Sequence, residues 1–162
     1  MRREFTVNIE EVRTVLDWVA FYRQQFHLPA EERGGYVMLP VTNAVGIVHV
    51  PKLFAEKLLA ALRQQGSPGP LLARQIRWTF IAAVDYAPGY RVLDLLSRND
   101  IHVPIVGSAL MIPTGLGRHT REGAYWVNPP ERDQRLPPLS TLITTALALR
   151  PIKANHRQRE II

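Results

Sequence analysis

The sequence predicts an α+β fold, built as a single domain over residues 1–150 with a mixed or antiparallel sheet and flanking helices. A length of 162 residues suits one domain, and a hydrophobic fraction of 46% is enough for a real core. Stretches with helical periodicity alternate irregularly with six or seven short apolar runs, which is typical of α+β proteins. Residues 151–162 are polar and basic, and we expect them to form a flexible tail.

The first elements are a helix and a strand. Asn8 and Glu11 have the spacing of a capping box, and an apolar stripe follows them, so an amphipathic helix is expected over residues 9–26. A charged loop containing glycine should occupy residues 30–35. An apolar strand is predicted at residues 36–41, followed by a turn at Thr42-Asn43.

The middle of the chain, residues 45–84, predicts a strand, a helix and two further strands. Residues 46–50 form a short β-branched run, and Pro51 is expected at the first helical position. Glycine and prolines at 66, 68 and 70 end the helix, and strands follow at 71–73 and 77–84. The helix has an apolar face made of Leu53, Phe54, Leu58, Leu59 and Leu62.

Alternation in the second of these strands assigns its side chains to two faces. Trp78 and Phe80 should share one face and pack against a helix, while Arg77, Thr79 and Ile81 share the other. We therefore expect Trp78 to be structural and Arg77 to be exposed. The remaining expected elements are a helix at 90–97, strands at 102–106, 108–112 and 124–127, a loop at 113–123, a connector at 131–138, and a last helix capped by Ser140 and ended by Pro151.

Composition limits the classes of function. There are 20 Lys and Arg against 14 Asp and Glu, and all but three of the 20 are arginine, so an anionic partner such as nucleic acid is favoured. The absence of cysteine excludes disulfides, a thiolate nucleophile and cysteine-ligated zinc. We find neither a signal peptide nor an apolar run of roughly 18 residues, and expect a cytoplasmic protein without a membrane partner.

Several short motifs follow one another in order. They are VGIVHVP at 45–51, RWTFIAAV at 77–84, GSALMIPTG at 107–115 and Tyr125-Trp126-Val127. This series resembles the N-terminal domain of bifunctional DNA primase/polymerase proteins, of the archaeo-eukaryotic primase superfamily, from about Val45 to Leu149. The resemblance implies a primase/polymerase-like scaffold. In that family the first strand supplies metal-binding carboxylates, and a later strand supplies a histidine for the nucleotide phosphates.

The chain departs from that pattern where the chemistry would lie. The first strand carries Ile47-Val48-His49-Val50, and no acidic residue occurs between Glu32 and Glu56. Two-metal nucleotidyl transfer needs at least two converging carboxylates, which one histidine does not replace. In place of the phosphate-binding histidine stand residues 77–80, RWTF. We therefore expect a catalytically inactive domain with no catalytic residue, metal or cofactor.

The basic residues are the remaining candidates, for contact with DNA or another nucleic acid. They would form an electropositive face if the turn before Trp78 and the later loop meet. Alternatively they are solvated loop charges. The set is Arg74 and Arg77, then Arg118, His119 and Arg121, and in the tail Lys153, Arg157 and Arg159.

Two other functions stay open. One is a protein–protein interaction module that uses an exposed sheet edge or the first helix and does not bind DNA. The other is an active nucleotidyltransferase whose carboxylates lie elsewhere, among Asp85, Asp94, Asp100 and Asp133. The five histidines show no zinc-binding spacing, and His49 is interpreted as a hydrogen-bonded strand histidine rather than a ligand.

Overall fold

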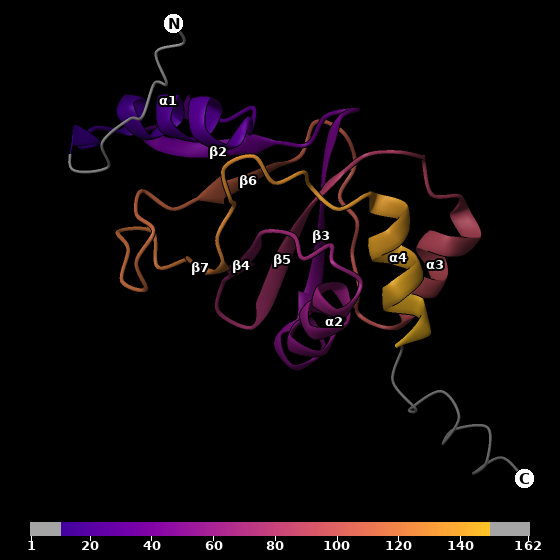
Figure 1. Cartoon of the computed structure of the whole chain (residues 1–162). Coiled ribbons are helices and arrows are strands. Elements are labelled where there is room, and N and C mark those ends of the chain that lie inside the picture. The colour runs from indigo at the N-terminus through magenta and orange to yellow at the C-terminus, as the bar shows by residue number, and fades with distance from the viewer. Residues whose placement is uncertain (1–10, 150–162) are drawn as a thin grey trace, which may run out of the picture.

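Two antiparallel sheets and four helices make up the computed structural model, which describes residues 11–149 (Figure 1). This confirms the α+β class. The helices are α1 (Val15–Phe26), α2 (Lys52–Gln64), α3 (Tyr90–Arg98) and α4 (Leu139–Ala148). The strands are β1 (Glu31–Arg33), β2 (Tyr36–Pro40), β3 (Val45–Pro51), β4 (Leu71–Ala73), β5 (Arg77–Ala83), β6 (Ala109–Ile112) and β7 (Tyr125–Asn128).

The larger sheet separates two hydrophobic cores. Its strand order is β3-β5-β4-β7, and the smaller sheet has the order β1-β2-β6. The first core lies on the face of the larger sheet that α2 and α4 cover, and it contains Phe54, Leu58 and Leu142. The second core joins the other face to α1 and to the smaller sheet. In Figure 1, α1 runs along β2, while α3 and α4 lie at the opposite side of the molecule. No helix within residues 11–149 combines the length and the apolar character needed to cross a membrane.

The alternation expected in β5 is confirmed. Trp78 and Phe80 belong to the first core, with α2 and α4, whereas Ile81 belongs to the second core. Thr79 is buried, and Arg77 is exposed at the start of the strand. The Lys52 ammonium lies 5.8 Å from the centre of the Trp78 ring.

The first helix starts later than expected. Thr14 is its N-cap: the Thr14 hydroxyl accepts a hydrogen bond from the Asp17 N–H at 3.1 Å, and the Asp17 carboxylate accepts one from the Thr14 N–H at 3.0 Å. This capping box lies inside the predicted helix and begins it at Val15, so residues 11–14 are not α-helical. Residues 9 and 10 lie outside the described part of the chain.

Two strand predictions were wrong. Residues 31–33 were expected in a loop but form β1, because they pair with β2 across the Gly34-Gly35 turn. Residues 102–106 were expected to form a strand, but only His102 pairs, in a single bridge to His49. Pro104 follows two residues later and has no N–H with which to continue a ladder.

Three details at helix starts also differ. Pro51 is the N-cap of α2 rather than its first residue, and Leu53 is 75% exposed rather than on the buried face. Ser140 is not the N-cap of α4, because Pro138 holds that position. Instead the Ser140 N–H donates to the Asp85 carboxylate at 2.9 Å, and the Ser140 hydroxyl binds the other oxygen of that carboxylate.

Candidate nucleic-acid interface

The turn between β4 and β5 presents two arginines at one end of the larger sheet. The Arg74 N–H donates to the Arg77 carbonyl at 3.2 Å, which closes the turn. Both side chains are exposed, and neither forms an ion pair within residues 11–149. The Lys52 N–H, at the start of α2, donates to the Ile76 carbonyl at 3.3 Å, so the turn is held against the helix. The two guanidinium groups therefore extend from a supported turn.

This turn borders a pocket of about 490 Å³. The pocket lies between the β4–β5 turn, the ends of β3 and β5, and the segment that leads into β7. Its lining residues are His49, Arg74, Gln75, Ile76, Arg77, Thr79, Glu122, Gly123 and Ala124. The pocket therefore brings the first cluster of predicted arginines next to the later loop.

His49 lies in this pocket as a neutral side chain. Its Nδ1 is 2.7 Å from the Thr79 hydroxyl, and its ring stacks on that of His102 with centroids 6.1 Å apart. Burial lowers the pKa of His49 to about 4, and the charges of His102, Arg74 and Arg77 act in the same direction. The hydrogen bond agrees with the interpretation of His49 as a strand histidine. Near neutral pH the positive charge of the pocket therefore comes from the arginines.

Arg118 lies beside Tyr125, a β7 residue that packs against the first core. Its guanidinium is 5.3 Å from the centre of the Tyr125 ring, a cation–π contact. Tyr125 on β7 pairs with Ala73, the residue before Arg74. The structure therefore places the regions of Arg74 and Arg118 on neighbouring strands, with Tyr125 toward the first core and the pocket on the other face of the sheet.

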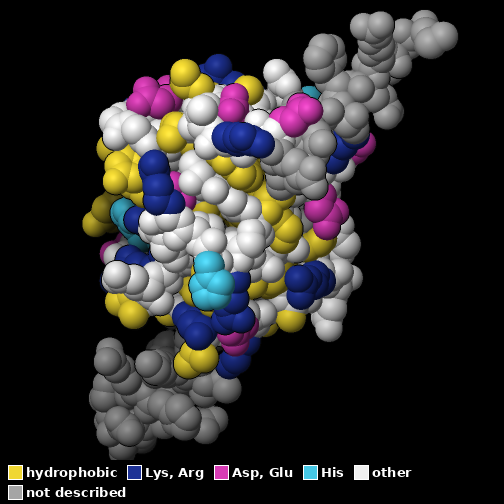
Figure 2. Space-filling model, turned by 90° about the vertical axis from the view of Figure 1, so that its left-hand side faces the viewer, with side chains coloured by type: hydrophobic (Ala, Val, Ile, Leu, Met, Phe, Trp, Pro, Cys, Tyr) yellow, Lys and Arg dark blue, Asp and Glu magenta, His cyan; other side chains and the backbone are white. Residues whose placement is uncertain are grey.

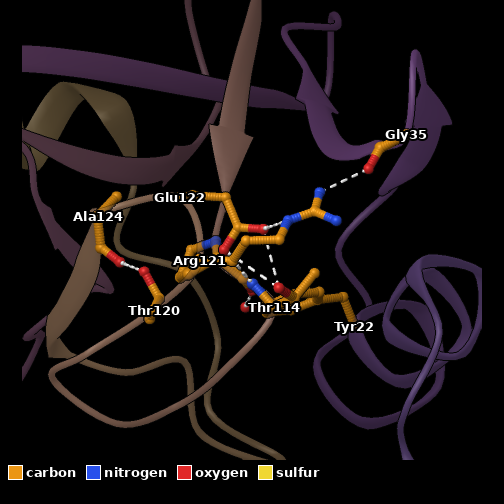
Figure 3. Close-up of polar contacts among 8 residues, drawn as sticks. Tyr22, Gly35, Thr114, Thr120, Arg121, Glu122 and Ala124 are labelled. Carbon is orange, nitrogen blue, oxygen red and sulfur yellow. Dashed lines mark hydrogen bonds and ion pairs between the residues drawn. The ribbon is translucent and has the colours of Figure 1, made fainter.

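Arg121 makes internal contacts instead. Its Nη2 donates to the Gly35 carbonyl at 2.7 Å (Figure 3), and its guanidinium lies 4.9 Å from the centre of the Tyr36 ring. Its Nε is 3.3 Å from the Glu122 carboxylate. Arg121 thus ties the loop before β7 to the β1–β2 turn. His119 is exposed in the same loop, whereas Lys153, Arg157 and Arg159 lie outside the described residues.

Glu122 is the one acidic residue that lines the pocket, and its carboxylate is engaged inside the loop. It accepts hydrogen bonds from the Thr114 N–H at 3.0 Å and from the Thr114 hydroxyl at 2.8 Å (Figure 3). Burial acts to raise the pKa of Glu122, but these hydrogen bonds and Arg121 outweigh it, and the pKa lies below its ordinary value. The carboxylate is therefore ionised and paired. Its ion pair is with Arg121, and within residues 11–149 it forms none with Arg74 or Arg77.

The loop that carries Arg118 is also anchored in the second core. The Tyr22 hydroxyl donates to the Pro113 carbonyl at 2.5 Å and accepts from the Trp126 indole N–H at 3.0 Å. Burial raises the pKa of Tyr22, so the hydroxyl stays protonated.

In Figure 2, Lys and Arg side chains gather around a histidine in the lower part of the face that is turned to the viewer.

Sequence reasoning missed several residues of this site. Gln75, Ile76 and Glu122 were not predicted as site residues, although all three line the pocket. No local sequence signal marks them, because the pocket forms only when β3 and β5 pair and bring His49 opposite Thr79 and Pro51 opposite Arg77. No group of three or more His, Asp or Glu within residues 11–149 is arranged to hold a metal ion.

Comparisons with protein-family models, with curated proteins and with solved structures find no match.

Proposed function

We propose that this chain is a non-enzymatic nucleic-acid-binding protein with a regulatory role, built on a primase/polymerase-like scaffold and acting in the cytoplasm. The observation that carries the proposal is the pair Arg74 and Arg77. Both are exposed, neither is paired with a carboxylate in the described chain, and both border a pocket whose carboxylate is engaged elsewhere. Arg118 is also exposed and lies beside Tyr125 on β7, the strand next to β4.

Arginines placed in this way suit a phosphate backbone. A guanidinium presents several N–H donors in a plane and can bind two phosphate oxygens at once. Contacts of this kind provide affinity without sequence preference, and they release counterions on binding. The proposal therefore concerns nucleic acid of any sequence.

The proposal includes the absence of nucleotidyl transfer. β3 contributes His49 to the pocket but no carboxylate. The Glu122 carboxylate is already bound to Thr114 and Arg121. The aspartates considered as alternatives do not line the pocket. Asp85 binds Ser140, and Asp94 pairs with Arg98. Template-dependent incorporation of nucleotides by the pure protein, lost when one acidic residue is changed, would overturn this part of the proposal.

Salt-dependent DNA binding by the full chain tests the proposal. Arg74→Ala and Arg77→Ala should each weaken binding uniformly across DNA sequences and reduce the slope of log Kobs against log salt by about one unit. Arg91→Ala is the matched control, because Arg91 is an exposed arginine on α3, away from the pocket. The control should leave both affinity and slope unchanged.

Two results would contradict this function. Equal slopes for the wild type and both turn variants would remove the turn from the interface. No measurable binding at low salt would reject nucleic acid as the partner, and would leave a protein–protein interaction module as the explanation of the exposed surface.

A further inference from the structure

The tip of the β4–β5 turn carries an exposed aliphatic side chain. Ile76 is 80% exposed and lies between Arg74 and Arg77, with Gln75 as the other tip residue. Its backbone is fixed, because its carbonyl accepts the Lys52 N–H and the turn closes through the Arg74–Arg77 hydrogen bond. The side chain extends from this fixed backbone into solvent.

Isoleucine is an uncommon residue at an exposed turn. Turns favour Gly, Pro, Asn, Asp and Ser, and neither tip residue of the β4–β5 turn, Gln75 or Ile76, is one of these. A β-branched apolar residue also gains nothing from exposure to water at a turn. Departures from local rules of this kind are expected where a residue serves a function.

We infer that Ile76 is an apolar wedge that enters the minor groove of duplex DNA and separates a base step, while Arg74 and Arg77 contact the flanking phosphates. This inference rests on the proposed function and names its ligand as double-stranded DNA. Minor-groove proteins use aliphatic side chains in this way, and the inserted residue unstacks a step and bends the duplex.

The surroundings of Ile76 fit such a contact. The minor groove is only about 6 Å wide, so a single side chain at a narrow tip can enter while the strands remain outside. Arg74 and Arg77 are both exposed and flank the tip in the sequence, so they can contact the phosphates that border the groove.

The test compares Ile76→Ala with Ile105→Ala in the full chain. Ile105 is 79% exposed and lies outside the pocket lining, in the segment next to Val41, so it matches Ile76 in type and exposure. Affinity for a duplex of about 25 base pairs and the duplex bend are measured, the bend by energy transfer between end labels. The wild type should bend the duplex by about 20° or more.

Ile76→Ala should remove the bend and weaken binding about tenfold or more, the factor expected when one large aliphatic side chain is no longer desolvated. Its salt slope should remain that of the wild type, because the arginines are unchanged. Ile105→Ala should behave as the wild type in every measurement.

Three outcomes would overturn the wedge. They are an unbent duplex with the wild type, a bend that survives in Ile76→Ala, and binding restricted to single strands. In each case the salt slopes of the Arg74 and Arg77 variants still decide the proposed function separately. Absence of all DNA binding by the wild type would overturn both.

Discussion

His49 shows how the surroundings of one residue fix its protonation state. Burial disfavours the charged imidazolium, and electrostatic interactions with His102, Arg74 and Arg77 act in the same direction, so the pKa of His49 falls from 6.5 to about 4. The unfolded chain therefore binds more protons at this residue than the folded chain between those two values. Lowering the pH through this window favours unfolding, and the contribution of neutral His49 is fully present above pH 6.5.

We expect the melting temperature of the wild type to fall between pH 6.5 and pH 4, and that of His49→Gln to fall less. Glutamine cannot titrate, and it keeps a polar group beside Thr79. Thermal unfolding of both proteins across this range checks the prediction. The carboxyl groups of Asp17, Asp85 and Glu122, whose pKa values are lowered, affect stability only at more acidic pH. They are present in both proteins. Parallel curves would show that His49 is accessible to protons in the folded state.

Strand β5 is the element that gives the clearest test of packing. Its side chains alternate between two cores, so neighbouring positions differ sharply in burial. Trp78 is 5% exposed against α2 and α4, while Arg77, one residue earlier, is exposed at the turn. The same strand thus supplies both a core residue and a member of the candidate interface.

Trp78→Ala should lower the free energy of unfolding by about 3–5 kcal/mol, as truncation of a large core aromatic does. Arg77→Ala should cost under about 0.5 kcal/mol, because it removes an exposed side chain. Denaturant unfolding of the two variants measures both values. If Trp78→Ala folded normally but no longer bound DNA, the ring would be a base-stacking platform rather than a core residue.

The sequence predicts elements whose signal is local. Periodicity identifies α2 to within a residue or two, and alternation assigns both faces of β5. β1 could not be predicted, because Glu31–Arg33 has no apolar pattern and becomes a strand only by pairing with β2. The Asp85–Ser140 hydrogen bonds at the start of α4 span 55 residues, so no local rule could reveal them.

The residues of the candidate site also divide into those that the sequence could predict and those that it could not. Charge alone pointed to Arg74 and Arg118, and the fold places their regions on neighbouring strands. Charge alone also pointed to Arg121, whose guanidinium is engaged with Gly35, 86 residues away in the chain. A charged loop residue cannot be assigned to a surface until its tertiary contacts are known.

At the scale of the whole molecule, the larger sheet is shared by two cores. Val48 and Phe80 face the first core, while Ile47 and Ile81, their neighbours in β3 and β5, face the second. Loss of either core would expose one face of the same strands to water. The two cores should therefore be lost together.

We expect a single unfolding transition for residues of both cores. Trp18 and Trp126 report on the second core and Trp78 on the first, so Trp78→Phe leaves fluorescence from the second core alone. The denaturant midpoint from this fluorescence should equal that from far-ultraviolet circular dichroism of the same variant. Separate midpoints would mean that the smaller sheet and α1 unfold independently.

The short strand β1 also bears on how copies of the protein behave toward one another. β1 is the outer strand of the smaller sheet, and its three residues are Glu31, Glu32 and Arg33. An open sheet edge is a template on which another chain can add a strand, and this leads to aggregation. Three residues offer an incoming strand few backbone hydrogen bonds, and charged side chains keep that edge hydrated. The edge strand β1, whose residues show no apolar pattern, is thus protected against the addition of a strand from another copy of the protein.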